Sequence, residues 1–95
     1  MPRYDALPRA RRELERLGQL DRARVLKALA ALEAGNENLD VVALEGCRPW
    51  LRLRAGNHRI IFRTVQRADG NLSFLIARIV DRKDLIRAVR QLGKN

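Results

Sequence analysis

Apolar residues in the first part of the chain recur at intervals of three or four positions. This spacing places them on one face of an α-helix, with charged residues on the other faces. Gly18 follows the last of these positions and is expected to end the helix as a left-handed residue. The apolar positions of this helix are Leu7, Ala10, Leu14 and Leu17.

A second helix is expected over residues 21–34. Asp21 is a good N-cap, and the pair Gly35 and Asn36 is typical of a helix end. Because the connection to the first helix is short, the two helices form a helical hairpin. Its apolar stripe consists of Val25, Ala28, Leu29 and Leu32.

Residues 36–46 are expected to form a loop, and beyond them the apolar period changes from helical spacing to two. Apolar and basic residues alternate over residues 50–54, which is typical of a half-exposed strand. Two further strands follow over residues 59–65 and 72–80, joined by an Asp-Gly turn at residues 69–70. The third strand is the most apolar, and we therefore expect it to be central in the sheet.

The last element expected is a helix over residues 83–92. The order helix, helix, three strands, helix predicts an α+β fold in which the N-terminal helical hairpin packs on a small antiparallel β-sheet. A short C-terminal helix follows the sheet. A chain of 95 residues has room for one such unit, so residues 1–95 are expected to form a single domain without a deep substrate cavity.

Alternation along the strands determines where the arginines point. If Leu51 and Leu53 face the helices, the residues between them face the other way. The same argument applies to the next strand, where Ile60 and Phe62 fit the core. The side chains expected on the opposite, uncovered sheet face are those of Trp50, Arg52, Arg54, Arg59, Ile61 and Arg63. Solvated sheet faces usually mix several polar residue types, whereas the charged residues on this face are all arginines.

The net charge of +9 is carried by one half of the chain. Residues 1–47 hold 8 basic and 8 acidic side chains, whereas residues 48–95 hold 12 and 3. Residues 46–68 contain six arginines and no acid. Guanidinium groups bind phosphate oxygens in a bidentate manner, so this segregation favours nucleic acid as a partner over an acidic protein.

Composition excludes several other classes of protein. Cys47 is the single cysteine, so neither a disulfide framework nor a cysteine zinc site is expected, and we expect a small apolar loop residue there. No apolar run approaches the length of a membrane span, and no signal peptide is visible. We therefore expect a cytoplasmic protein without a membrane partner, a metal or a cofactor.

Three segments resemble the RelE/ParE superfamily of bacterial toxins. They are residues 44–46 (LEG), residues 50–62 (WLRLRAGNHRIIF) and residues 81–85 (DRKDL), and the resemblance extends over residues 8–90. It implies a RelE-like fold and a toxin of a type II toxin–antitoxin pair. RelE-like members cleave messenger RNA in the ribosomal A site, whereas ParE-like members inhibit DNA gyrase by binding.

The resemblance also implies partners. An antitoxin is expected to wrap the toxin, and operator DNA is expected to be bound only through that antitoxin. The positive charge of residues 48–95 predicts that this antitoxin is acidic. The RelE-like branch adds the ribosome and its mRNA. The ParE-like branch is the alternative, and a nucleic-acid-binding module without toxicity is a third interpretation.

Site residues follow from matching the motif position by position. Arg52, Arg54 and Arg59 match basic positions of the strand–turn–strand motif, and Arg82 matches the arginine near the last helix. The sequence departs from the motif at two places. Trp50 replaces a basic residue, and Ile86 replaces the tyrosine that ends the RelE motif.

RNA cleavage requires that the growing charge on phosphorus be stabilised and that protons move. The arginines expected to stabilise this charge are Arg52, Arg59 and Arg82. Arginine does not deprotonate in proteins, so His58, the single histidine, is the candidate general acid or base. A turn residue is the equal alternative for His58, and Asp81 and Asp84 are alternatives for the proton transfer, although an aspartate before a helix is more often an N-cap.

Four further residues are expected to contact RNA: Arg48, Trp50, Arg54 and Arg63. The arginines would bind phosphates. The indole of Trp50 can stack on a base, but packing in the core or at its rim is the more common role of a large aromatic side chain.

Overall fold

The computed structural model describes residues 4–92 as three α-helices, one 3₁₀ helix and a five-stranded sheet. The helices are α1 (Pro8–Arg16), α2 (Gln19–Glu33) and α3 (Leu85–Leu92), with the 3₁₀ helix η1 at Arg82–Asp84. The strands are β1 (Tyr4–Ala6), β2 (Val41–Ala43), β3 (Leu51–Ala55), β4 (His58–Gln66) and β5 (Leu72–Asp81). Within these residues no helix is both long and apolar enough to cross a bilayer.

The strands lie in the order β1-β5-β4-β3-β2. Strands β2 to β5 form an antiparallel meander, whereas β1 pairs with β5 in parallel. The predicted α+β fold is confirmed, but the sheet is mixed rather than wholly antiparallel. Strand β5 is interior, as its apolar sequence predicts, while the middle position belongs to β4.

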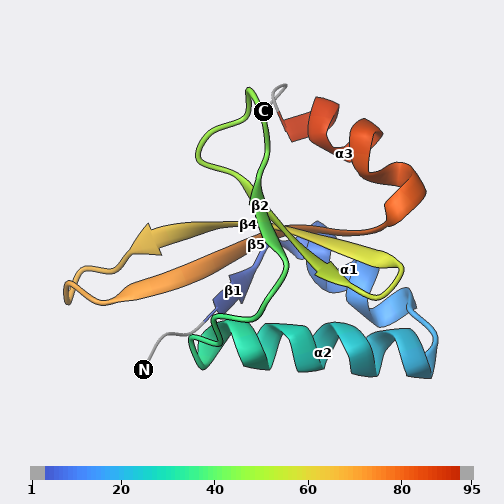
Figure 1. The fold of residues 1–95 in the computed structure, drawn as a ribbon, viewed down its shortest axis with the longest axis horizontal. Coiled ribbons are helices and arrows are strands. Elements are labelled where there is room, and N and C mark those ends of the chain that lie inside the picture. The colour runs from blue at the N-terminus through green and yellow to red at the C-terminus, as the bar shows by residue number, and fades with distance from the viewer. Residues whose placement is uncertain (1–3, 93–95) are drawn as a thin grey trace.

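Helices cover both faces of the sheet (Figure 1). Helices α1 and α2 lie along one face, and α3 lies on the other, beside the loop that joins β2 to β3. The predicted helical stripes form the first core, because Ala10, Val25 and Leu29 are completely buried against the sheet. The strand residues in this core are Leu53, Ala55, Ile60, Phe62, Ile76 and Ile79.

The second core lies on the face that the sequence predicts to be uncovered, and that prediction is wrong in part. Ala88 of α3 packs there against Ile61, Ala77 and Val80, all of them buried. Helix α3 therefore covers this face over β4 and β5. On the β3 side of the same face lie Arg52 and Arg54, of which Arg54 is exposed, and we call this side the open part of the face.

Strands β1 and β2 have no counterpart in the sequence prediction. Each has three residues, which is too short to give an alternating pattern. Both occupy sheet edges, where pairing with one neighbour fixes them as strands. The prediction of a continuous loop over residues 36–46 is therefore wrong at Val41–Ala43.

The turn between α1 and α2 also differs from the prediction. Gly18 has φ −61° and is the N-cap of α2, so it is not a left-handed C′ residue, and Asp21 lies inside the first turn of that helix. The physical reason is Arg22. Its guanidinium donates to the carbonyl oxygens of Leu14, Glu15 and Leu17, so the end of α1 needs no glycine cap.

Strand β5 contains a bulge, and beside it the side chain of Arg78 connects α1 with α3. Ile61 pairs with Arg78 whereas its neighbour Phe62 pairs with Ile76, so one β5 residue lacks a β4 partner. Next to this bulge, the Arg78 guanidinium donates to both carboxylate oxygens of Glu13 and to the Gln91 side chain. Glu13 in turn accepts the backbone N–H of Ile79 at 2.9 Å. We call these three side chains, Glu13, Arg78 and Gln91, the α1–α3 tie.

We expect Glu13→Gln to lower the free energy of unfolding by about 2–4 kcal/mol, because it leaves a largely buried guanidinium without its counter-charge. The Glu13 side chain is only 19% exposed, and that of Arg78 only 12%. Urea denaturation measures the change, and Glu15→Gln on the exposed side of α1 is the matched control. Equal stability of the two variants would contradict this prediction.

Candidate functional site

Three arginines meet on the open part of the sheet face. Arg54 and Arg59 are direct cross-strand partners between β3 and β4, and Arg52 lies two residues before Arg54 on the same face. Their orientation follows from the residues between them. Leu53 and Ile60 also pair across the two strands and are completely buried on the opposite face, so the arginines must point away from that core.

Arg82 reaches the same place from a distant part of the sequence. Its backbone N–H donates to the carbonyl of Asn57 in the β3–β4 turn at 2.8 Å. The carboxylate of Asp81 accepts the N–H of Lys83 at 3.0 Å and thus caps η1. Asp81 therefore has the N-cap role that the sequence offers as an alternative to catalysis. We call Arg52, Arg54, Arg59 and Arg82 the arginine cluster.

The other three guanidinium groups of the cluster act electrostatically on Arg59. Partial burial lowers the pKa of Arg59, and the charges of Arg54, Arg52 and Arg82 lower it further. Its guanidinium donates to the carbonyl oxygens of Gly56 and His58, both at 3.0 Å. These bonds fix its position at the turn, and an arginine remains charged at neutral pH even when its pKa is lowered.

A carboxylate faces the arginine cluster from the β2 side. Asp40 Oδ1 lies 3.3 Å from Nη1 of Arg52, and its charge raises the pKa of Arg59. Sequence reasoning does not identify this residue, because Asp40 precedes the acid-free stretch and lies in the segment predicted to be a loop. The β-branched pair Val41 and Val42 is the signal that could have revealed the strand beside it.

The arrangement of Arg54 and Arg59 is unfavourable for stability. Like charges directly opposite each other on an antiparallel pair are destabilising. Neither residue forms an ion pair with an acid in the described part of the chain. A site that concentrates unpaired positive charge in this way is suited to an anionic ligand.

The other residues predicted to contact RNA lie along the same face or beside it. Trp50 is half-buried and packs against the second core, so its more common role, packing, is the one observed. The guanidinium carbon of Arg63 lies 5.8 Å from the centre of the Trp50 ring, a cation–π contact. Arg48 is exposed in the loop between β2 and β3.

His58 lies on the other face of the sheet from Arg59. It pairs with Ala55 and Asp81, and it is only 8% exposed. Its Nδ1 has no hydrogen-bond partner within the described part of the chain. A proton transfer by His58 at the arginine cluster would therefore require its ring to move around the turn. Among residues 4–92, no three His, Cys, Asp or Glu side chains gather as a metal site.

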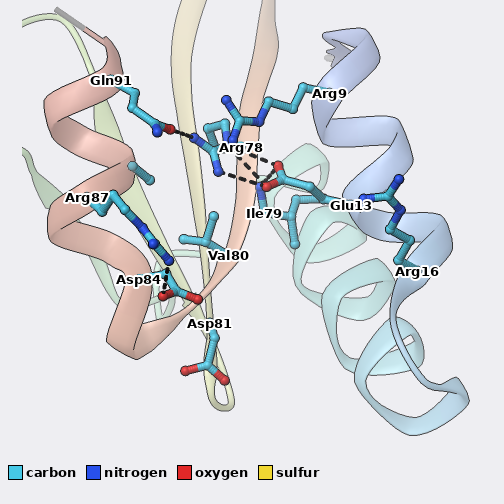
Figure 2. Close-up of a pocket in the computed structure, with 11 residues that line it drawn as sticks. Arg9, Glu13, Arg16, Arg78, Ile79, Val80, Asp81, Asp84, Arg87 and Gln91 are labelled. Atoms are coloured by element: carbon cyan, nitrogen blue, oxygen red, sulfur yellow. Dashed lines mark hydrogen bonds and ion pairs between the residues drawn. The ribbon is translucent and has the colours of Figure 1, made fainter.

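A separate cleft of about 370 Å³ lies between α1 and α3, with β5 as its floor (Figure 2). Its charges are largely compensated. Arg78 is bound by Glu13, and Arg87 donates to Asp84 at 2.7 Å. This cleft contains the α1–α3 tie, and its mixture of acids and bases contrasts with the arginine cluster. We therefore assign the candidate site to the arginine cluster.

Comparisons with known proteins identify the fold. No family model matches the chain, and no curated protein sequence matches it. A chain of the RelB–RelE antitoxin–toxin complex from Methanococcus jannaschii has a TM-score of 0.66 at 19% identity, covering 87% of this chain and 95% of that one. A chain of the archaeal RelE–RelB complex from Pyrococcus horikoshii OT3 gives 0.64 at 23%, covering 85% and 94%. The predicted RelE-like fold is confirmed.

We expect Arg54→Thr to stabilise the protein by roughly 0.3–1 kcal/mol, because it removes a like-charge cross-strand pair and places a β-branched residue in the strand. Chemical denaturation at low and high salt measures the effect. Since salt screens exposed charges, the gain should shrink as salt rises. A loss of stability at low salt would show that Arg54 contributes to the fold instead.

Proposed function

We propose that this protein is the toxin of a toxin–antitoxin pair and a ribosome-dependent endoribonuclease that cleaves messenger RNA. The observation that carries the proposal is the arginine cluster, in which side chains from β3, β4 and η1 meet with little compensating charge. The RelE-like fold supports the same function, since the similar chains belong to RelB–RelE complexes.

In the proposed reaction the 2′-oxygen of one nucleotide attacks the adjacent phosphorus, and the bond from phosphorus to the 5′-oxygen of the next nucleotide breaks. The products are a cyclic phosphate and a free 5′-hydroxyl. Negative charge grows on the phosphate oxygens as the new bond forms. Arg52, Arg59 and Arg82 supply fixed positive charges for those oxygens, and Arg59 is already held in position by backbone carbonyl groups.

Proton transfer requires a group outside the arginine cluster, because an arginine does not deprotonate in proteins. One proton must leave the 2′-hydroxyl, and one must reach the departing 5′-oxygen. His58 is the candidate for this exchange, although in the described structure it faces α1 and α2. The ribosome is proposed to hold the 2′-hydroxyl in line with phosphorus, because alignment alone lowers the barrier.

A second candidate function is inhibition of DNA gyrase by binding, as in the ParE-like branch. The observation that favours it is Ile86, which is 69% exposed on α3 where the RelE motif has a tyrosine. An isoleucine side chain cannot donate a hydrogen bond or exchange a proton. In this case the arginine cluster would bind its target without performing chemistry.

We expect expression of the protein alone to arrest bacterial growth, with translation falling before DNA supercoiling changes.

Arg59→Ala and Arg82→Ala should each slow mRNA cleavage by about 10²–10³-fold, the usual effect of removing one stabilising charge. Cleavage is measured on translating ribosomes by mapping new 5′ ends. Arg12→Ala, which removes an exposed arginine of α1, is the matched control and should cleave at the wild-type rate.

The order of cellular events separates the two candidates. If a DNA damage response and gyrase–DNA adducts appear before translation falls, the ParE-like function is the correct one. Wild-type cleavage by Arg59→Ala would remove that residue from the site. His58→Ala should have a smaller effect than Arg59→Ala if His58 has only a structural role at the start of β4.

The proposed antitoxin should carry an acidic segment that is disordered when free and folds on binding. It should cover the arginine cluster or hold α3. Because opposite charges steer such an association, the association rate should fall steeply with salt while the dissociation rate changes less. The double reversal Arg52→Glu and Arg59→Glu should slow association and abolish toxicity together, as measured by stopped-flow mixing and growth. If association is unchanged, the antitoxin binds elsewhere, for example on α1 and α2.

A further inference from the structure

Asp40 is a counter-ion beside the arginine cluster, and it has no part in the reaction proposed above. We propose that Asp40 competes with the phosphate of the ligand for Arg52 and thereby weakens and tunes binding at the cluster. This inference rests on the proposed function for the identity of the ligand, an RNA phosphate. It concerns the regulation of the same site.

The backbone places Asp40 beside the cluster. The carbonyl of Asp40 accepts the N–H of Arg54 at 3.1 Å, so the pairing of β2 with β3 continues one step beyond the strand. Val42 is the cross-strand partner of Arg52. Because side chains two residues apart share a face, Asp40 and Val42 lie on the same face as the arginines. The position of the carboxylate therefore follows from strand geometry.

The contact between Asp40 and Arg52 is built so that it can open. The two atoms are 3.3 Å apart in a single contact, and the side chain of Asp40 is 47% exposed while that of Arg52 is 22% exposed. Because the Asp40 carboxylate is accessible to water, solvent weakens its attraction to Arg52. A phosphate can bind the guanidinium through two oxygens at once, which is a stronger arrangement than one carboxylate contact. Phosphate can therefore displace Asp40.

The competition has two consequences for an anionic ligand. While the pair is closed, Arg52 is not available to neutralise a phosphate, so three arginines of the cluster act instead of four. When the pair opens, the freed carboxylate remains close to the bound phosphate and repels it. Both effects weaken binding, and both depend on the charge of Asp40 rather than on its shape.

The test is binding of a 12-nucleotide single-stranded RNA, followed by fluorescence anisotropy over a series of salt concentrations. Asp40→Asn keeps the shape and the backbone hydrogen bond but removes the charge. We expect it to bind about two- to fivefold more tightly at low salt. The slope of the logarithm of affinity against that of salt should steepen by about 0.7, the value for one more neutralised phosphate on a single strand. Asp40→Glu restores a carboxylate and should return both quantities towards wild type.

Asp5→Asn is the matched control, because it removes the same charge from an exposed residue of β1, at the opposite edge of the sheet. If Asp5→Asn and Asp40→Asn strengthen binding equally, net charge explains the effect and the proposal is wrong. Weaker binding by Asp40→Asn would overturn it as well, because Asp40 would then position Arg52 for the ligand.

A second probe separates this proposal from the proposed function. Inorganic polyphosphate presents phosphates without ribose or bases. If Asp40→Asn strengthens polyphosphate binding while RNA does not bind the wild-type protein, the competition at Arg52 holds and the RNA function fails. If RNA binds, and Arg54→Ala weakens it, but Asp40→Asn leaves both affinity and salt slope unchanged, the competition fails and the RNA function holds.

Discussion

The register between β3 and β4 is the constraint on which the candidate site depends. Leu53 opposite Ile60 fills the first core, and Arg54 opposite Arg59 follows directly on the other face. A slip of one residue would exchange the faces, moving guanidinium groups into the core and apolar side chains to the surface. Burial of two apolar residues thus enforces the meeting of two like charges. The site exists because the core fixes the strand pairing.

Repulsion within the arginine cluster lowers the free energy of unfolding, and apolar burial in the two cores offsets this loss. Burial on both faces of the sheet is independent of the charges on its open part, so the fold can tolerate repulsion there. Helix α3 connects the two sides of this balance. Its residues pack on the second core, while η1 at its start carries Arg82 to the cluster. A perturbation that loosened α3 would therefore reduce stability and also disperse the positive charge.

Much of this structure follows from local patterns in the sequence. The helical stripes and three strands are predictable because each is long enough to show its period, and alternation correctly separates Leu53 from Arg54. The two short edge strands show no alternating pattern, and apart from the valine pair of β2 they are fixed as strands only by partners elsewhere in the chain. The packing of α3 on the sheet and the contact of Asp40 with Arg52 likewise depend on tertiary contacts that no local pattern in the sequence shows. Positions of the arginines are thus predictable, whereas their counter-ion is not.

The hydrogen bond from the Ile79 N–H to Glu13 also affects the outer edge of the sheet. Strand β1 covers only the Phe74–Ile76 part of the outer side of β5, and beyond it the backbone of β5 would present a free edge. Glu13 occupies the Ile79 N–H there, and a helix lies where another strand would have to approach. Open strand edges are templates for pairing between molecules. The Glu13 carboxylate that binds Arg78 therefore also protects the sheet, whose strands are rich in β-branched residues, against edge-to-edge aggregation.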